Sequence, residues 1–344
     1  IGYHAVPVIL DAIQKNLTRA NLGEVLDAMK TSALQDAHGL TWLKGDASPG
    51  YIPADLERQS VSKLLEYAFD DWCIARLAGR LERSSDERFF RTRAGLYRNV
   101  FDPSVGFMRG RLADGSWRAP FSPAGSDGRG DDYAVGNAWQ SSWFVPHDVA
   151  GLAALMGSRE ALVKKLDALF EQPSAIEGAS APPDVSGMLG QYAHDNVSSH
   201  QVAYLYAYAG EPWKTAARVR QIARTLYGTG PDGLCGNEGG GQLSAWYILS
   251  ALGFYPVNPA EGAYVIGTPL VERAETDVAG GRTFTVEAKG LSDDNLYIQS
   301  ATLNGAPLDR CWFRHEDLAT GGRLQFVMGP EPNTAWASAP EAAP

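Results

Sequence analysis

The sequence predicts a mainly helical protein in which a series of helices precedes a small antiparallel β unit. Apolar residues recur at helical spacing in successive segments as far as Leu252. After Pro256 the spacing changes, and apolar residues alternate with polar ones as they do in half-buried strands. No part of the chain alternates strands with helices, which argues against a parallel doubly wound sheet.

The helical segments follow one another as hairpins, joined by loops that carry polar and aromatic residues. This order fits an α/α toroid, in which the loops gather at one end and form the site there. A superhelical solenoid is the alternative, although no repeat of fixed length supports it. The segments expected to be helical are 8–16, 22–34, 61–77, 86–100, 149–156, 161–170, 185–192, 202–209, 213–227 and 242–252.

Several of these segments carry end signals. Ser60 can cap the helix over 61–77. Asp86 and Glu87 suit the first turn of the next helix, where the helix dipole favours negative charge. On the helix over 61–77, Asp70 and Asp71 lie off the apolar face beside Trp72, so both a solvated face and an inward polar role stay open.

Four segments near the C-terminus have the period of strands, and a hairpin turn is expected at Asn304-Gly305. These segments are 263–266, 283–288, 295–300 and 323–328. We therefore expect a helical catalytic-type domain over 1–257 and an antiparallel β unit over 258–333. The Ala- and Pro-rich tail over 334–344 is expected to be disordered.

Charge and hydropathy exclude two classes of partner. The formal net charge is -10, whereas nucleic acids and anionic membranes are bound by clustered Lys and Arg. No apolar run approaches the roughly 18 residues that a membrane helix needs.

The chain starts without Met inside what looks like structured sequence, so we expect it to be part of a longer protein.

The densest group of polar and aromatic side chains lies between Asp131 and Asp148. Flat rings stack on the apolar faces of a sugar while amides and carboxylates bind its hydroxyls, so this mixture predicts a carbohydrate site. The structural alternative is a helix start, with Pro146 in the first turn and Asp148 near the positive end of the dipole. Both can hold together. The candidate sugar-binding residues of this cluster are Asn137, Trp139, Gln140, Trp143, His147 and Asp148.

Three further loops hold candidate site residues: 55–59 with Glu57, 194–201, and 237–242. His194 and His200 do not have the i, i+4 spacing of a metalloprotease pair, so we assign them to substrate binding. Oxygen atoms of Asn196 and Glu238 suit a hard cation such as calcium, although capping or turn formation is the alternative for each.

Short motifs from one end of the chain to the other are similar to those of one enzyme family. They are Gly2-Tyr-His-Ala, Gly50-Tyr-Ile-Pro-Ala-Asp55, Glu66-Tyr-Ala-Phe-Asp-Asp-Trp72, Gly106-Phe-Met-Arg-Gly-Arg111, Gly136-Asn-Ala-Trp-Gln140, Trp143-Phe-Val-Pro-His-Asp148, Gly190-Gln-Tyr-Ala-His194, Tyr204-Leu-Tyr206, Pro212-Trp-Lys-Thr215, Ser244-Ala-Trp-Tyr247 and Leu252-Gly-Phe-Tyr-Pro256. The chain resembles the C-terminal portion of a glycoside hydrolase family 92 α-mannosidase.

The resemblance implies an (α/α)6 barrel preceded by a β-sandwich domain that this chain lacks and that would complete the site. It also implies calcium-dependent hydrolysis of α-mannoside glycans or oligosaccharides with inversion, through an acid and a base carboxylate. Inversion places the two carboxyls roughly 6.5–9.5 Å apart, with room for a water. A secreted, periplasmic or cell-surface location follows from the same resemblance.

The chain departs from the family pattern at positions that carry the chemistry. The family has Glu immediately before Gly-Asn-Ala-Trp, where this chain has Val135, which cannot donate a proton. An acidic pair after Gly-Asn is here Glu238-Gly239, and Asn-Glu-Pro-Ser-His is here Asn196-Val-Ser-Ser-His200. Glu238 and Asp195 are the carboxylates left as candidates for the base.

Three interpretations follow from these departures. The first is an atypical or weak α-mannosidase that acts on substrates with a good leaving group, such as a mannosyl phosphate, because such a group needs little protonation. The second is a non-catalytic relative that binds mannosides. The third is an inactive structural fragment. The fold alone does not separate them, because function depends on the site.

Overall fold

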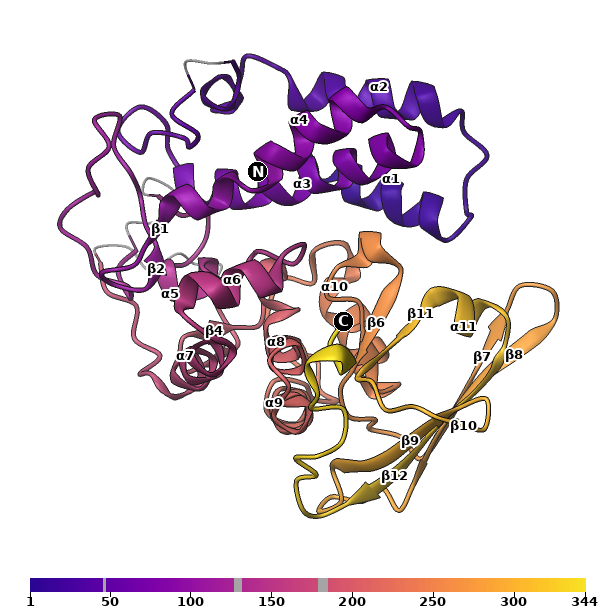
Figure 1. Cartoon of the computed structure of the whole chain (residues 1–344). Helices are drawn as coiled ribbons and strands as arrows, with labels where there is room; N and C mark the ends of the chain where they lie inside the picture. The colour runs from indigo at the N-terminus through magenta and orange to yellow at the C-terminus, as the bar shows by residue number, and fades with distance from the viewer. Residues whose placement is uncertain (46–47, 127–131, 179–184) are drawn as a thin grey trace. The chain divides into compact units, whose positions relative to one another are not determined.

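The computed structural model describes residues 1–45, 48–126, 132–178 and 185–344 (Figure 1). Asp131, the first residue of the predicted carbohydrate cluster, lies outside these ranges. The contacts divide the chain into two compact units. The first unit comprises Ile1–Met156 and Glu171–Tyr192, and the second comprises Gly157–Phe170 and Ala193–Pro344. The domain boundary predicted at residue 257 falls inside the second unit, and it stays a prediction.

Helix α3 is the centre of the helical group of the first unit. Buried residues occur at nearly every position from Ser60 to Ala78, as in a helix that is covered on all sides. Helices α1, α2 and α4 pack against α3, as Figure 1 shows. The bounds are α1 Ala5–Gln14, α2 Leu22–Ala33, α3 Ser60–Arg80 and α4 Ser84–Ala94.

A network of charged side chains joins the N-terminal segment to α3. The two ring nitrogens of His4 lie 2.8 Å from Asp70 Oδ1 and 2.8 Å from Glu66 Oε2. Asp71 Oδ2 accepts a 2.8 Å hydrogen bond from Arg93 Nε. Asp70 and Asp71 are 0% and 1% exposed, so both carboxylates have the inward polar role and neither is on a solvated face.

The rest of the first unit consists of short elements and loops. They are β1 Phe101–Asp102, β2 Phe107–Met108, α5 Ala138–Ser141, α6 Val149–Met156 and β3 Met188–Leu189, with β4 Tyr192–Ala193 at the edge of the unit. Strands β3 and β4 pair with each other. The helix predicted over 185–192 is therefore wrong, because its apolar residues are divided between two paired strands.

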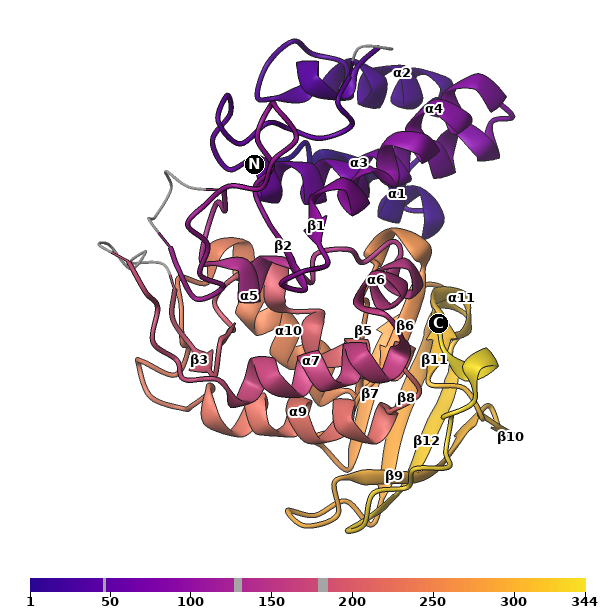
Figure 2. The same cartoon turned by 60° about the vertical axis from the view of Figure 1, so that its left-hand side comes forward.

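In the second unit, a group of helices precedes the strands. Their bounds are α7 Arg159–Glu171, α8 Leu205–Tyr208, α9 Pro212–Thr225 and α10 Gln242–Ala251. The Asp167 carboxylate of α7 accepts a 2.9 Å hydrogen bond from the hydroxyl of Tyr206 and lies 2.5 Å from the ammonium of Lys214. These contacts hold α7 alongside α9, as Figure 2 shows.

The strands of the second unit form two sheets. The five-stranded sheet has the order β10-β9-β12-β8-β7, and the three-stranded sheet has the order β11-β6-β5. The strands are β5 Phe254–Tyr255, β6 Ala263–Ile266, β7 Arg273–Val278, β8 Arg282–Lys289, β9 Tyr297–Leu303, β10 Ala306–Pro307, β11 Trp312–Arg314 and β12 Gly322–Gly329, with the short helix α11 His315–Ala319 before β12. Phe284 and Phe313 stack in the core between the strands, with centroids 6.1 Å apart.

The prediction of a purely antiparallel β unit needs one correction. Strand β12 is antiparallel to β9 but parallel to β8. It lies between these two strands, which run in opposite directions, so it can be antiparallel to only one of them. The two-residue period fixes which side chains face the core and carries no information on strand direction.

The tail predicted to be disordered is folded in this structure. Residues Pro340–Ala342 form a 3-10 turn, and Ala342 is buried. The carbonyl of Ala342 accepts a 3.1 Å hydrogen bond from the backbone N–H of Cys311. Composition indicated disorder, but the small side chains of the tail allow its backbone to approach Cys311 closely.

Candidate functional site

Asn137 organises the part of the predicted carbohydrate cluster that the structure describes. Its side-chain oxygen accepts a 3.3 Å hydrogen bond from the backbone N–H of Gln140 and so caps α5. Its amide nitrogen donates to the Ala124 carbonyl at 3.2 Å and to Gln191 Oε1 at 2.9 Å. The side chain is fully buried, so it positions two loops from inside the protein.

The two indoles of the cluster differ in accessibility. Trp143 is 1% exposed, and its Nε1–H donates to the Trp139 carbonyl at 2.7 Å. Trp139 is half-buried and meets the ring of Phe107 edge to face, with centroids 4.7 Å apart. Only Trp139 of this pair leaves part of its ring exposed, whereas Trp143 belongs to the core. The sugar-stacking role predicted for Trp143 has no accessible ring face in this structure.

Gln140 is also an interior residue, 2% exposed. Its amide nitrogen lies 3.8 Å from Met188 Sδ. Its side-chain oxygen packs against Gly136, where a Cβ would come within 1.6 Å of that oxygen. Glycine is required at this position both for space and for its φ of +77°.

His147 and Asp148 stabilise the start of α6. His147 Nε2 donates to the Ala94 carbonyl at 3.1 Å, and burial lowers the pKa of this imidazole to about 4, so the ring is neutral at pH 7. Asp148 accepts hydrogen bonds from the Gly151 backbone at 2.9 Å and from the Tyr97 hydroxyl at 2.7 Å. The predicted helix start is confirmed for Asp148, but Pro146 precedes α6 and is not in its first turn as predicted, because the helix begins only at Val149.

Val135 lies in a bend just before the α5 cap. It is half-buried, and its neighbour Ala134 donates its backbone N–H to the Ser62 hydroxyl at 3.0 Å. The aliphatic side chain can neither donate nor accept a proton. A carboxyl at this position would stand one residue before Gly136 and two before Asn137.

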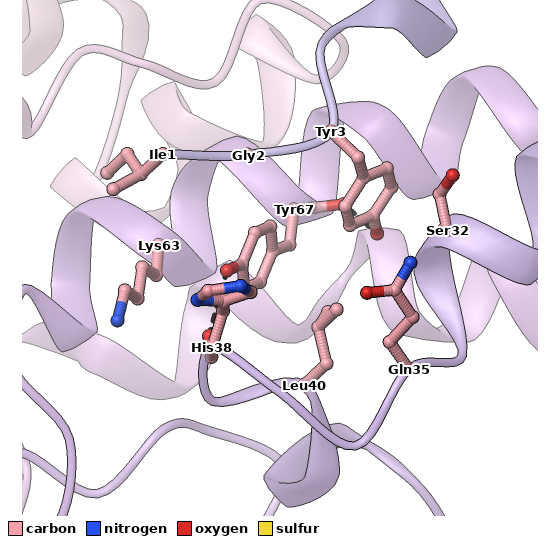
Figure 3. Close-up of a pocket in the computed structure, with 9 residues that line it drawn as sticks. All are labelled: Ile1, Gly2, Tyr3, Ser32, Gln35, His38, Leu40, Lys63 and Tyr67. Atoms are coloured by element: carbon pink, nitrogen blue, oxygen red, sulfur yellow. Dashed lines mark hydrogen bonds between the residues drawn. The ribbon is translucent and has the colours of Figure 1, made fainter.

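Glu57 pairs with the ammonium of Lys63 on α3. Lys63 in turn lines a cavity of about 290 Å³ in the first unit, shown in Figure 3. The rings of Tyr3 and Tyr67 stack at this cavity with centroids 5.3 Å apart, and Gln35 lies at the opposite end from Lys63. Glu57 itself does not line this cavity, whereas its ion-pair partner Lys63 does.

His194 and His200 lie together in the second unit, with ring centroids 4.9 Å apart. The Tyr227 hydroxyl donates to the Leu243 carbonyl at 2.9 Å, so the 2.7 Å contact between His194 Nε2 and that hydroxyl is donated by the histidine. His200 Nε2 donates to the His194 carbonyl at 2.9 Å. Burial lowers the pKa of His194 to about 2 and that of His200 to about 4. Both rings are therefore neutral core groups at pH 7.

The remaining predicted carboxylates lie in the same unit. Asp195 is 8% exposed, and a Cβ on Gly236 would lie 2.3 Å from its Cβ, so the glycine-rich turn packs closely over it. Glu238 caps α10, because its oxygens accept from the backbone N–H groups of Leu243 at 2.9 Å and Ser244 at 3.2 Å. A hydrogen bond from the Ser244 side chain, and then these N–H groups, hold the pKa of Glu238 below its usual value.

The comparison with known families identifies the family of this chain. The profile of the Glycosyl hydrolase family 92 catalytic domain matches residues 1–330. The chain belongs to glycoside hydrolase family 92.

Solved structures of the family agree closely with this chain. A family 92 α-mannosidase from Bacteroides thetaiotaomicron, in complex with mannoimidazole, is 38% identical with a TM-score of 0.93, and the match covers 100% of this chain and 45% of that one. A family 92 inverting mannosidase from Bacteroides thetaiotaomicron VPI-5482 is 33% identical with a TM-score of 0.89, covering 100% and 48%.

A curated relative is described as an uncharacterized secreted glycosidase of Arthroderma benhamiae. It is 28% identical, and the match covers 97% of this chain and 46% of the relative. The chain thus spans about half the length of the relatives that it matches.

The candidate residues of this family 92 chain divide between its two units. The first unit holds Glu57, the residues around Asn137, and Val135, whereas the second holds the two buried histidines with Asp195, Asn196 and Glu238. Most of these residues serve caps, loops or the core. Their catalytic and substrate-binding roles stay predictions.

Calcium would need roughly six to eight oxygen ligands. Asn196 Oδ1 accepts from the Ser198 backbone at 3.3 Å and from the Ser198 hydroxyl at 2.9 Å, and the Glu238 oxygens cap α10. Across the part of the chain that the structure describes, no group of three or more His, Cys, Asp or Glu residues could hold a metal ion. Asn196 and Glu238 would supply only part of the oxygen ligands that calcium needs, so further oxygens would have to complete such a site.

Sequence reasoning missed the loop residues that Asn137 holds in place. Glu177 lies in the Ala- and Pro-rich stretch 172–183, which has no periodicity to mark a functional carboxylate. Gln191 belongs to a family motif but was given no role, and its burial is visible only in the folded chain. Arg118 and Asp132, fourteen positions apart, form an ion pair with a 2.9 Å contact.

Proposed function

We propose that this chain forms part of a family 92 glycoside hydrolase that acts on α-mannosides, with atypical or weak activity. Family membership and the two similar mannosidase structures support the substrate class. The observation that limits the activity is Val135, a half-buried aliphatic residue where the family pattern has Glu. The helices of both units would then be parts of an (α/α)6 barrel.

The absence of an acid at Val135 restricts which substrates can react. A positioned general acid contributes typically about 10²–10⁴-fold by protonating the leaving group. A leaving group that is stable as an anion needs little of this help. The proposal therefore favours substrates such as mannosyl phosphates or activated aryl mannosides over ordinary glycosidic bonds.

Inversion requires a carboxylate that activates water, and Asp195 and Glu238 are the candidates. The lowered pKa of Glu238 keeps it ionised at neutral pH, but its oxygens are already bonded to the start of α10. Asp195 is 8% exposed and packs against Gly236 of the glycine-rich turn. Because both Glu238 oxygens accept backbone N–H groups of α10, we assign the base to Asp195 and a supporting role to Glu238.

Calcium dependence and export belong to the same proposal. When bound, calcium would supply positive charge near the oxygens of Asn196 and Glu238. A secreted location is supported by the description of the Arthroderma benhamiae relative. Among the described residues, no helix combines the length and the apolar character needed to cross a membrane.

Hydrolysis of 4-nitrophenyl α-mannoside, followed by NMR of the first anomer released, tests the proposal. We expect slow turnover that releases the β-anomer and that falls in Asp195→Asn. Binding of methyl α-mannoside without any turnover would favour the non-catalytic interpretation. Loss of both binding and turnover would leave a structural fragment.

A further inference from the structure

The first unit contains a cavity of about 330 Å³ that none of the predicted site residues line. Its walls are the loop 118–126, the pair Asp132-Tyr133, and residues 177–178. The side chains that carry chemistry there are Arg118, Phe121, Ser122, Asp132, Tyr133 and Glu177. We call it the Glu177 cavity.

Direct hydrogen bonds fix Glu177 at this cavity. The Ser122 hydroxyl donates to Glu177 Oε2 at 2.6 Å. The backbone of Glu177 donates to the Ala124 carbonyl at 3.0 Å and accepts from the Ser126 N–H at 2.7 Å. Ser122 therefore orients the exposed Glu177 carboxylate, while two backbone hydrogen bonds hold the residue against the opposite loop.

Two buried side-chain amides hold the loops that form the walls of the cavity. Asn137 donates to the Ala124 carbonyl at 3.2 Å and to Gln191 Oε1 at 2.9 Å. Gln191 donates through its own amide to the carbonyls of Pro173 at 2.6 Å and Ala175 at 2.8 Å. Because Asn137 and Gln191 are 0% and 1% exposed, they preorganise the cavity without entering it.

The charge of the cavity selects against anions. Asp132 and Glu177 are carboxylates and Arg118 is a guanidinium, so the three side chains together carry one negative charge. Arg118 Nε donates to Asp132 Oδ1 at 2.9 Å, which neutralises part of the positive field that a phosphate would need. Fixed carboxylates and a hydroxyl are suited to accepting and donating hydrogen bonds to neutral hydroxyls.

An aromatic ring completes the cavity. Phe121 lines it, and the Arg109 guanidinium stacks on Phe121 at 4.8 Å from the ring centroid. Sugar rings stack on such aromatic faces while polar groups fix their hydroxyls. The volume lies at the small end of ligand sites, which are typically about 300–1,000 Å³, so it suits a single sugar ring rather than a long oligosaccharide.

We propose that the Glu177 cavity is a subsite for one uncharged sugar residue of the substrate glycan, stacked on Phe121 and hydrogen-bonded by Glu177 and Asp132. This inference rests on the proposed action on mannosides and adds where part of the glycan binds. Ser122 orients the Glu177 carboxylate, and the two buried amides hold the loops that carry it.

Titration of the full 344-residue chain with α-1,2-mannobiose, followed by calorimetry, tests the subsite. The variants are Glu177→Gln and Phe121→Ala, with Asp27→Asn as a control that removes an exposed carboxylate from α2 in the same unit. We expect each cavity variant to weaken mannobiose binding by at least tenfold and the control to bind like the parent. Inorganic phosphate should give no heat of binding that depends on Glu177.

Hydrogen exchange of the parent chain with and without mannobiose gives a readout that needs no variant. Protection of the backbone N–H groups of Phe121, Ser122, Gly125 and Ser126 is expected, since these residues line the subsite. Unchanged affinity in both cavity variants, or no protection over 120–126, would overturn the subsite. If the parent still hydrolyses 4-nitrophenyl α-mannoside in that case, the proposed function stands without it; if the parent neither binds nor hydrolyses, both fail.

Discussion

Replacement of Asn137 by Ala tests whether one buried amide holds the site loops of the first unit. The change removes the cap of α5, worth about 0.5–2 kcal/mol. It also leaves the buried Gln191 Oε1 without the Asn137 donor, at about 1–3 kcal/mol, whereas the Ala124 carbonyl keeps its hydrogen bond from the Glu177 N–H. The expected loss in the free energy of unfolding is therefore about 1.5–5 kcal/mol.

Asn21→Ala is the matched control. Asn21 caps α2 through its side-chain oxygen, which accepts from Gly23 N at 3.0 Å and Glu24 N at 3.5 Å, but it is exposed. Its loss should cost only about 0.5–2 kcal/mol, because water replaces the exposed contacts.

Urea unfolding followed by tryptophan fluorescence gives the two differences, read from the transition that reports the first unit. Equal destabilisation by Asn137→Ala and Asn21→Ala, within about 1 kcal/mol, would show that Asn137 is an ordinary helix cap. The argument that it organises the two loops would then be refuted.

Three further predictions concern pH and metal. Burial lowers the pKa of His4, but hydrogen bonds to Asp70 and Glu66 outweigh this effect and raise the pKa to about 10. The stability that His4 contributes is thus complete below about pH 6.5 and is lost as the pH rises to about 10. The melting temperatures of the parent and His4→Gln should therefore converge over that range. Burial lowers the pKa of His200 to about 4. The stability that the neutral ring contributes is therefore present above about pH 6.5 and lost as the pH falls towards 4. Over that interval the melting temperature of His200→Gln should be less sensitive to acid than that of the parent. Removal of calcium with EDTA should lower both the turnover of 4-nitrophenyl α-mannoside and the melting temperature, with restoration by added calcium but not magnesium; unchanged values would contradict the calcium proposal.

Hydrophobic periodicity predicted most of the helices because burial on a regular helix leaves a repeating pattern. The predicted segment 149–156 coincides with α6, and 242–252 differs from α10 by one residue. The predicted helix over 185–192 failed because two strands of two residues are too short to show a period of their own.

Pairing and burial of polar groups required the folded chain. Asp70 and Asp71 could not be assigned from α3 alone, because their inward position depends on Tyr3, His4 and Arg93, which are distant in sequence. The direction of β12 in the five-stranded sheet could not be predicted either, because strand pairing also joins residues that are distant in sequence.

The candidate site was predicted only in part. The cluster around Asn137 was found from its composition, and Asp148 was correctly interpreted as a helix start. Trp143 looked like a sugar platform because composition cannot distinguish an accessible indole from a buried one. Glu177 escaped notice because a single carboxylate in an Ala- and Pro-rich stretch has no pattern that marks it.

Our central proposal is that this family 92 chain is part of an enzyme that acts on α-mannosides but lacks a general acid at Val135. The most direct measurement compares kcat/KM of the parent and Val135→Glu on two aryl α-mannosides, one with a good leaving group and one with a poor one. The account predicts a gain approaching about 10²–10⁴-fold for the poor leaving group and little change for the good one. An equal effect on both substrates, or a parent that already hydrolyses both at similar rates, would contradict it.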